Sequence, residues 1–471
     1  MKVLIVSKEL FPYTEGETAN NVKELALALR NEGCEVTLVI PAYPFLLEQK
    51  ELIPICNQNI NIGEDEFRAV FFKTESSGLP VYLIYSPALF SKDQAESSVF
   101  FCKLVFLLIK KVLKRAPDIL LANDWTTGLL MPLSKEEAKD SCGIFVIHNM
   151  AHGLIPSEKK HIIGLSEAYY REENMGFYGQ ISLLKAGIIY SDAIITLSPT
   201  YAKEIQTPEF GAGVDDVLRN ASHKLYGILN GCNYTLWNPE TDPFIKRCYS
   251  EDDLEGKLVC KKELLEELRI ADSSNAVNIP IIAMPLELEE QNGCSLVISA
   301  ANRLAEMGLI IISLGRGDPI VENLFCELKN IYPNNFYLLK RWNQITLHKL
   351  IAGADMLLIP SLFEPCGTVQ MYGMRYGTLP IVRATGGLND TVTDPEESFP
   401  GTGFKFYRAD PFDMLKAIER ALSAYKDKKI WTQMMKNAMK KRFLWSSTAK
   451  EYIKVFKELH TFLRKSPLPS F

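Results

Sequence analysis

Long apolar runs alternate with amphipathic stretches along this chain of 471 residues, and the alternation limits its possible folds more than any other feature. The runs of the first half are KVLIVS, CEVTLVIP, PDILLAND, GIFVIHN and DAIITLSP. The rhythm restarts near residue 279 with IPIIAMP, LIIISLG, NNFYLLK, ADMLLIPS and TLPIVRA. Continuously apolar strands separated by helices are typical of parallel sheets covered by helices. The pattern therefore predicts an α/β protein with two Rossmann-like, doubly wound domains.

The boundary between the domains is expected in the segment ILNGCNYTLWNPETDPFI, residues 228–245. This segment is dense in Asn, Gly, Pro and Asp, which favour turns for distinct backbone reasons. We therefore assign residues 1–240 to an N-terminal domain and residues 241–447 to a C-terminal domain. Ligands of such folds bind at the carboxyl ends of the strands, so the active site is expected in a cleft between the two domains.

Composition narrows the class of protein. The chain has 52 basic and 57 acidic residues, a formal net charge of −5, and no long basic cluster, so we expect no nucleic-acid partner. The most apolar stretch, residues 99–113, contains three lysines, so we expect a helix in a core and no membrane span. Ten cysteines without metal-ligand spacing, and a start at the strand MKVLIVS without a signal peptide, favour the reducing cytoplasm.

Five strings carry a family resemblance. They are HNMAHGL (148–154), SPTYAKEIQTPEFGAGVDDVL (198–218), ILNGCNYTLWNPETDP (228–243), SLFEPCGTVQMYGMRYGTLPIVRATGGLNDTV (361–392) and TGF (402–404). In this order they closely resemble the bacterial glycogen synthases and the plant starch synthases, over nearly the whole chain. The resemblance implies a GT-B glycosyltransferase that moves glucose from ADP-glucose to the non-reducing end of an α-1,4-glucan with retention. It implies no metal and no other cofactor, and residues 448–471 resemble the family's helix that returns to the first domain.

Three candidate catalytic residues follow predicted strands, at the edge where parallel-sheet sites are built. His148 and Asp124 end GIFVIHN and PDILLAND, and Glu364 follows ADMLLIPS. The resemblance implies that His148 and Glu364 contact the donor glucose and that Asp124 lies near the sugar and the acceptor. Asn123 stands where the family commonly has a histidine, so the neighbouring pocket is expected to differ.

Backbone groups of two glycine-containing turns are candidates for binding the donor. Glycine lets a backbone approach a ligand closely, and backbone N–H groups at helix starts favour anions. Cys366 is expected to be a small loop residue because no paired histidine occurs in its motif. The resemblance adds a tryptophan face for stacking adenine and an asparagine at the cleft. The candidate donor-binding residues are Gly16, Asn230, Trp342, Cys366, Gly367, Thr368, Thr385, Gly386 and Gly387.

The family's basic donor residues are replaced. In FPYTEGETANNV, Thr14 stands for a lysine and Glu17 for the second glycine of the KxGG loop, while Gly16 is kept. In MPLELEEQNG, Glu287 stands for an arginine and Asn292 for a lysine that clamp the diphosphate. Glu17 would be strained if its φ were positive.

These replacements make the donor region four charge units more negative than the family pattern: one at Thr14, two at Glu287 and one at Asn292. A glutamate ~4 Å from a phosphate oxygen would cost on the order of 4 kcal/mol at an effective dielectric constant of ~20. Arg316, in SLGRGDP, is the best candidate for a compensating cation, and Arg341 and Arg383 are weaker ones.

Three hypotheses follow. The first is a working glucan synthase with α-1,4-glucan and nucleotide sugar as substrates. The second is an inactive paralogue, a pseudoenzyme that binds glucan or a partner synthase. The third is a transferase with a different nucleotide-sugar donor. The sequence leaves the oligomeric state open, so a homo-oligomer is compatible with all three.

Overall fold

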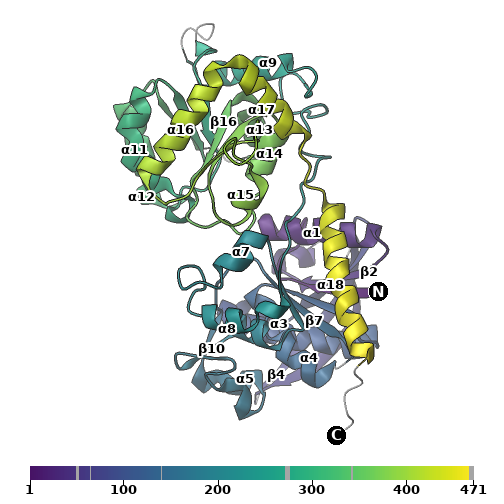
Figure 1. The fold of residues 1–471 in the computed structure, drawn as a ribbon. Coiled ribbons are helices and arrows are strands. Elements are labelled where there is room, and N and C mark those ends of the chain that lie inside the picture. Colours follow the sequence, from purple (N-terminus) through teal and green to yellow (C-terminus); the bar gives the residue numbers. More distant parts are fainter. Residues whose placement is uncertain (49–51, 64, 139, 271–275, 341–342, 466–471) are drawn as a thin grey trace. The chain divides into compact units, whose positions relative to one another are not determined.

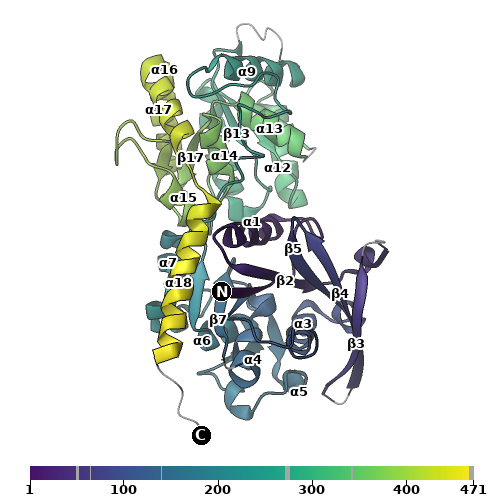
Figure 2. The ribbon, with the colours of Figure 1, turned by 90° about the vertical axis from the view of Figure 1, so that its right-hand side faces the viewer.

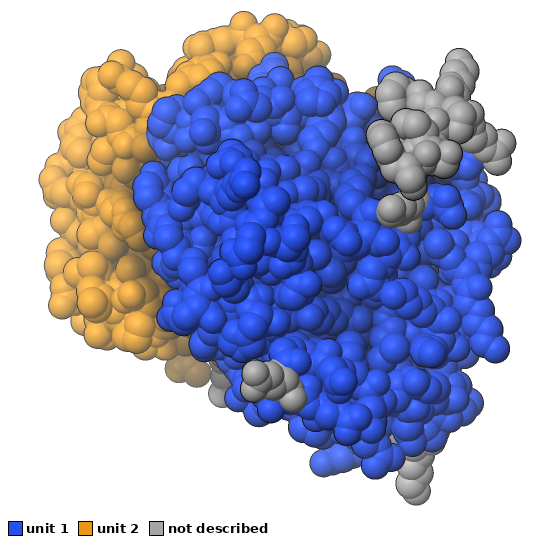
Figure 3. Space-filling view, turned by 90° about the horizontal axis from the view of Figure 1, so that it is seen from below, with its two compact units in different colours: residues 1–231, 445–471 blue, residues 232–444 orange. Residues whose placement is uncertain are grey.

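The computed structural model describes residues 1–48, 52–63, 65–138, 140–270, 276–340 and 343–465. The chain forms two compact units, coloured separately in Figure 3: unit 1 comprises Met1–Gly231 and Trp445–Phe471, and unit 2 comprises Cys232–Leu444. The chain thus enters unit 2 after Gly231, earlier than the boundary expected near residue 240. The reason is packing, because Trp237 stacks between His348 and Tyr372 of unit 2, with ring centroids 3.8 and 4.0 Å apart.

Unit 1 is built on a nine-stranded sheet in the order β12-β11-β7-β6-β1-β2-β5-β4-β3. Its first seven strands in this order are parallel. The central strands β11, β7, β6 and β1 are almost entirely buried, which explains their continuously apolar sequences. The strand bounds, in sheet order, are β12 Leu225–Gly227, β11 Ala193–Thr196, β7 Cys142–Ile147, β6 Ile119–Asn123, β1 Lys2–Val6, β2 Glu35–Pro41, β5 Leu79–Tyr85, β4 Asp65–Ser76 and β3 Ile53–Ile62.

The strands β4 and β3 extend this sheet in antiparallel pairing, and the apolar-run pattern did not reveal them. In β3 the burial alternates between exposed and partly buried positions, so the strand lacks a continuous apolar run. A small antiparallel sheet is a second addition to unit 1, formed by β8 Leu154–Pro156, β10 Gln180–Ser182 and β9 Gly176–Phe177.

Helices cover the sheet of unit 1 (Figures 1 and 2). The stretch expected to be a core helix is α3, which is buried along most of its length and continues into a π-helical turn at Ile109–Leu113. The C-terminal helix α18 packs against α1. The helix bounds are α1 Glu17–Asn31, α2 Ala88–Ser91, α3 Gln94–Leu108, α4 Leu130–Glu137, α5 Lys160–Ile163, α6 Leu183–Tyr190, α7 Pro199–Glu204, α8 Asp215–Asn220 and α18 Trp445–Lys465.

Unit 2 holds a six-stranded parallel sheet in the order β15-β14-β13-β16-β17-β18. Its order reverses between β13 and β16, which is where ligands of doubly wound folds bind. The strand bounds, in sheet order, are β15 Phe336–Leu339, β14 Ile310–Leu314, β13 Ile281–Met284, β16 Met356–Ile359, β17 Leu379–Arg383 and β18 Phe404–Phe406.

Several helices of unit 2 begin at an aspartate whose carboxylate accepts hydrogen bonds from the first turn. Asp318, Asp410 and Asp427 cap α12, α16 and α17 in this way. The helix bounds are α9 Glu255–Glu267, α11 Cys294–Glu306, α12 Pro319–Ile331, α13 Gln344–Gly353, α14 Val369–Arg375, α15 Gly386–Thr391, α16 Pro411–Lys426 and α17 Lys428–Lys440. Within the described parts of the chain, no helix has the length and apolar character needed to cross a membrane.

Candidate functional site

Two predicted site residues of unit 1, Asp124 and His148, directly follow the adjacent strands β6 and β7. His148 is buried, and its Nε2 lies 3.0 Å from Oδ1 of Asn123. The Asn123 amide nitrogen donates to the Val6 carbonyl at 3.2 Å, which fixes the amide with its oxygen toward the histidine. His148 Nε2 therefore carries the proton, and Nδ1 is the acceptor nitrogen. Asn123, noted in the sequence only as a departure from the family, orients the histidine.

Burial sets the charge of His148 and Asp124, the residues that follow β7 and β6. It lowers the pKa of His148 to about 4, so the imidazole is neutral near pH 7. Burial also raises the pKa of Asp124 to about 7, against the opposing effect of hydrogen bonds from backbone N–H groups of Asn149, His148 and Trp125. The Asn149 side-chain amide donates to the same carboxylate at 3.1 Å. This edge of unit 1 therefore offers hydrogen-bonding groups with little net charge.

Asp124 adopts a backbone conformation that few residues other than glycine use, with φ 65° and ψ 170°. Such strain costs on the order of 1–3 kcal/mol and tends to occur at functional sites. The next residue, Trp125, packs on Gly153 of the HNMAHGL string: a Cβ atom at Gly153 would lie 1.9 Å from the Trp125 ring. The two strand-end loops thus hold each other in place.

The loop after β1 keeps its turn but has no cation at the position of the family lysine. The Thr14 hydroxyl accepts a hydrogen bond from the Leu10 N–H at 2.8 Å, and the Thr14 N–H donates to the Leu10 carbonyl at 2.9 Å. Gly16 carries the positive φ, 134°, and Glu17 begins helix α1 without one. The condition for strain at Glu17 is therefore not met, because in this turn Gly16 adopts the conformation that favours glycine.

Asn230 is the last of the predicted residues in unit 1. It is buried, and its Nδ2 has no hydrogen-bond partner among the described residues. A buried donor without a partner is unfavourable by about 1–3 kcal/mol. The group is therefore suited to an acceptor supplied by a ligand.

In unit 2 the Glu364 loop and the Thr385–Gly387 turn form one backbone assembly. The Gly387 N–H donates to the Glu364 carbonyl at 3.0 Å. A Cβ atom at Gly386 or Gly387 would lie 1.9 Å from the carbonyl oxygen of Glu364 or Cys366, respectively. The structure thus requires both glycines for the packing of the two loops, a reason the sequence did not reveal, and the Gly387 N–H is already used.

Hydrogen bonds from a buried side chain also stabilise the Glu364 loop. The buried Gln370 amide donates to the carbonyls of Cys366 and Gly367 at 3.1 and 3.0 Å, and Gly367 has φ 67°. Ser361 Oγ donates to Glu364 Oε2 at 3.4 Å. Cys366 is buried, and Thr368 is the residue before helix α14. The arrangement fixes the Glu364 backbone rigidly at the end of β16.

The loop MPLELEEQNG follows β13 and is joined to the loop that contains Arg316. Leu288 N–H donates to the Arg316 carbonyl at 3.2 Å, and Leu288 pairs with Gly317 in a parallel bridge. A Cβ atom at Gly317 would lie 2.4 Å from the Leu288 carbonyl oxygen. The Asn292 side-chain amide donates to the Glu287 carbonyl at 2.8 Å. Asn292, at the place of a lysine, therefore ties its own loop.

The charged side chains of these two loops differ in their partners. Glu289 and Glu290 accept hydrogen bonds from Gln291 and Ser295. Glu287 and Arg316 are exposed, and neither side chain has a hydrogen-bond or ion-pair partner among the described residues. Arg316 is therefore free to meet an anion beside the position where Glu287 opposes one.

Arg383, one of the two weaker candidates for a compensating cation, is not available to an anion in the way that Arg316 is. Arg383 is buried and donates to the Ser361 carbonyl at 2.9 Å and to the Leu362 carbonyl, so its guanidinium is used in the fold. Trp342, the predicted adenine platform, and Arg341 lie outside the described residues.

Two doubly wound units, with polar loops at the carboxyl ends of both sheets, define a glycosyltransferase of the GT-B class. The sucrose-phosphate synthase of Thermosynechococcus elongatus shares the fold, with a TM-score of 0.62 at 17% identity over 98% of this chain and 99% of that one. Residues 2–220 match the family described as "Starch synthase catalytic domain", and residues 268–441 match "Glycosyl transferases group 1".

Full-length relatives define the family more closely. The glycogen synthase of Desulfatibacillum aliphaticivorans is 39% identical, over 97% of this chain and 98% of that protein. The catalytic domain of starch synthase IV from Arabidopsis thaliana, solved with ADP and acarbose, has a TM-score of 0.87 at 28% identity, over 98% of this chain and 99% of that one. The chain belongs to the glycogen synthase family and is a glucosyltransferase of the glycogen and starch synthase type.

Proposed function

We propose that this protein transfers glucose from ADP-glucose to the non-reducing end of an α-1,4-glucan, with retention and without a metal ion or other cofactor. The observation that supports it most is the intact sugar side: a neutral His148 oriented by Asn123, the strained Asp124 and the locked Glu364 loop. The Arabidopsis relative binds ADP and acarbose, a nucleotide and a saccharide, at the same fold. All ten cysteines are free, which supports a reducing cytoplasm.

The retained groups have the chemistry to hold a sugar. The His148 Nδ1 accepts a hydrogen bond from a sugar hydroxyl, because burial keeps the imidazole neutral. The Glu364 carboxylate accepts others, and the rigid loop beneath it fixes the direction from which the sugar is held. Holding the reacting sugar in one geometry is itself a large part of catalysis.

The nucleotide side limits turnover. Departure of ADP develops negative charge on the diphosphate, and fixed cations aimed at this charge lower the barrier. Thr14, Glu287 and Asn292 supply none, and Thr14 and Asn292 are hydrogen bonded within their own loops. Arg316 supplies the cation in our proposal, because its loop is bonded to the Glu287 loop. We therefore expect slow transfer.

A second function is favoured by the same hydrogen bonds. Thr14 and Asn292 are integrated into the loops that the family uses for the donor, which suits a paralogue that binds glucan but no longer transfers glucose. In this case the protein serves as a glucan-binding protein or a partner of an active synthase.

Release of ADP from ADP-glucose in the presence of glycogen separates the two functions. The proposed transferase releases ADP faster than its Glu364→Ala variant does. Equal rates for the two proteins would contradict transfer, and glycogen co-sedimentation without ADP release would support the paralogue. Thermal shift with a panel of nucleotide sugars checks the donor, because the bound donor raises the melting temperature by mass action. A larger shift with another nucleotide sugar would contradict ADP-glucose.

A further inference from the structure

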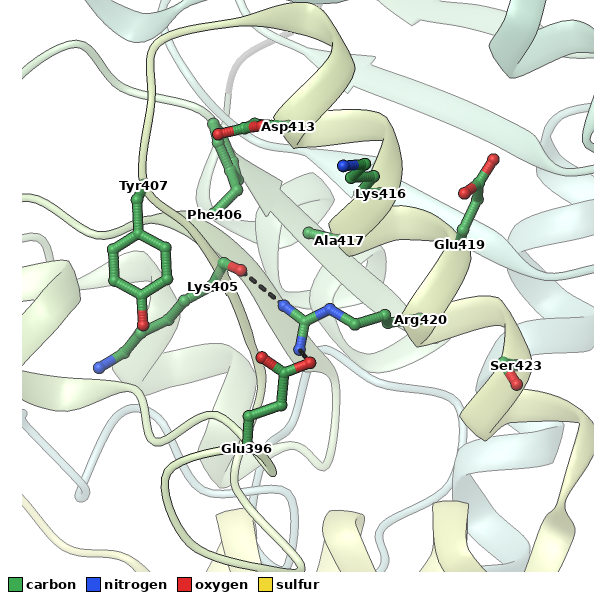
Figure 4. Close-up of a pocket in the computed structure, with 10 residues that line it drawn as sticks. All are labelled: Glu396, Lys405, Phe406, Tyr407, Asp413, Lys416, Ala417, Glu419, Arg420 and Ser423. Carbon is green, nitrogen blue, oxygen red and sulfur yellow. Dashed lines mark hydrogen bonds and ion pairs between the residues drawn. The ribbon is translucent and has the colours of Figure 1, made fainter.

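A pocket of about 540 Å³ lies in unit 2, between the end of β18 and helix α16 (Figure 4). Its volume is within the range of small-molecule sites, about 300–1,000 Å³. Strand β18 is the edge strand of the sheet, beyond the strands β16 and β17 whose loops carry the predicted donor residues. The sequence pattern gave no indication of this pocket.

The positive charges at the floor of the pocket are already paired. Arg420 donates to both oxygens of Asp394, at 2.8 and 3.0 Å, and lies 3.2 Å from Glu396. It also donates to the Lys405 carbonyl at 2.7 Å, as Figure 4 shows. Lys405 Nζ is 3.0 Å from the Glu397 carboxylate. At this floor an anion such as phosphate would meet two cations that acidic groups have neutralised, so Arg420 and Lys405 do not favour it.

The lining as a whole carries no net charge. Its carboxylates and its cations are equal in number: Glu396, Asp413 and Glu419 against Lys405, Lys416 and Arg420. The balance favours neither sign of charge strongly, whereas a neutral ligand with many hydroxyl groups finds both donors and acceptors. The lining therefore selects a neutral, polar ligand.

One face of α16 presents polar groups that remain available. Lys416, Glu419 and Ser423 are exposed, line the pocket and follow one another at helical spacing. Their side chains have no hydrogen-bond or ion-pair partner among the described residues, and the Lys416 ammonium lies 4.4 Å from the centroid of the Phe412 ring. An ammonium, a carboxylate and a hydroxyl can together bind several sugar hydroxyls.

Tyr407 provides an apolar surface beside these groups. It is 62% exposed, whereas the preceding Phe406 is 3% exposed and packs inward. The Tyr407 hydroxyl lies 3.4 Å from Glu397 Oε1. An aromatic side chain with an apolar face and a wet polar tip is suited to a sugar ring, because the C–H bonds on one face of the ring are apolar.

We propose that this pocket is a second saccharide site that holds a segment of the glucan chain. The choice of glucan rests on the proposed function, while a neutral saccharide as ligand follows from the lining alone. A polymer held at this site and at the transferring site gains affinity from the higher effective concentration of its bound end. The site would keep the enzyme on its polymer between transfers.

The full-length protein and its Tyr407→Ala variant, compared in glycogen affinity electrophoresis, provide the first test. Loss of the ring should weaken glycogen retention about fivefold, as expected for an aromatic contact of about 1 kcal/mol. Phe399→Ala is the matched control, because Phe399 is 64% exposed in the same unit and does not line the pocket. Equal weakening by both variants would overturn the proposal.

Tyr407→Phe keeps the ring and removes only the hydroxyl, so it should retain glycogen like the unmodified protein. Hydroxyl-radical footprinting adds a local readout: maltoheptaose should protect Tyr407 from oxidation, and millimolar inorganic phosphate should not. Protection by phosphate, or none by maltoheptaose, would overturn the proposal. ADP release tests transfer separately, so Tyr407-dependent glycogen retention without ADP release would contradict the proposed transfer and leave this site standing.

Discussion

The residues predicted to hold the sugar and those predicted to hold the diphosphate, which we call the sugar side and the diphosphate side, depart from the family pattern to different degrees. On the sugar side the predicted residues are present and are oriented by contacts within the fold, as in the His148–Asn123 pair. The diphosphate side keeps its loop backbone but not its cations. Gly16 and Gly293 still adopt positive φ values of 134° and 71°. Glycines with positive φ are thus present in the same loops in which the family's cations are replaced.

The comparison shows that the backbone conformation of a loop and the charge of its side chains can vary independently. Gly293 stays glycine because a Cβ atom there would lie 2.1 Å from the Pro360 carbonyl oxygen, so the fold itself requires it. Glu287 is exposed, and Thr14 and Asn292 make hydrogen bonds within their loops. Positions that packing does not constrain can therefore differ from the family pattern while the backbone of the loop is kept.

Restoring the family's cations should have the largest effect. The triple variant Thr14→Lys, Glu287→Arg, Asn292→Lys should raise the rate of ADP release about 1,000-fold. Each well-placed group that stabilises developing charge contributes about 100-fold or more, and we expect the contributions of the three groups to add only in part. A coupled assay with ADP-glucose and glycogen measures the rate. Adding Glu364→Ala to the triple variant should abolish the gain. An unchanged rate in the triple variant would show that the sugar side is also defective.

Removing the proposed substitute cation should have the next largest effect. Arg316→Ala should lower kcat/KM for ADP-glucose about 100-fold if its guanidinium stabilises the leaving diphosphate. Arg303→Ala is the matched control, since Arg303 is 65% exposed and pairs with Glu306 on α11. Similar activity of the two variants would remove Arg316 from the mechanism and favour the non-catalytic paralogue.

The buried sugar side should give the protein a distinct pH dependence of stability. The pKa of Asp124 is raised from 3.8 to about 7 in the folded state, so the folded protein binds more protons than the unfolded chain between these values. Stability is therefore lost as pH rises through this window. Asp124→Asn should melt several degrees higher than the unmodified protein at pH about 8, and the difference should shrink toward pH about 4.

His148 acts in the opposite direction, because its pKa is lowered from 6.5 to about 4 and its contribution to stability is lost as pH falls through that window. It is present in both proteins of the Asp124→Asn comparison, so the difference between their melting temperatures isolates Asp124. A difference that does not vary with pH would show that the Asp124 carboxylate is not desolvated.

The sequence predicted most of this fold because buried parallel strands are continuously apolar. β1, β2 and β6 lie within the runs that were predicted as strands. β3 was missed, because its side chains alternate on an exposed edge and its place is set by pairing with β4. The domain boundary was placed late, because turn-forming residues do not show that Trp237 stacks within unit 2.

For the site, we expected functional residues to follow parallel strands, and this placed Asp124 and His148 at one edge of the sheet. The expectation succeeds because it depends only on sheet topology. The orientation of the His148 side chain could not be predicted, because the role of Asn123 depends on the carbonyl of Val6, which is distant in sequence. Strain at Glu17 was expected only if its φ were positive, and Gly16 and Asp124 carry the positive φ values instead. Backbone conformation at a single residue depends on tertiary contacts that residue types alone do not specify.

The smallest expected effect concerns the replaced residues themselves. If Thr14 and Asn292 now stabilise their loops, Thr14→Val and Asn292→Ala should each lower the free energy of unfolding by about 1 kcal/mol, the usual net value of one hydrogen bond. Urea unfolding measures the change, and Asn302→Ala is the control because, among the described residues, the Asn302 amide makes only long, exposed contacts, with Glu306 at 3.3 Å and with the Tyr332 hydroxyl at 3.4 Å. The restored lysines should then gain activity while losing a similar amount of stability. Unchanged stability in both variants would mean that these side chains are idle, and that the diphosphate side lost its cations without acquiring any structural role in exchange.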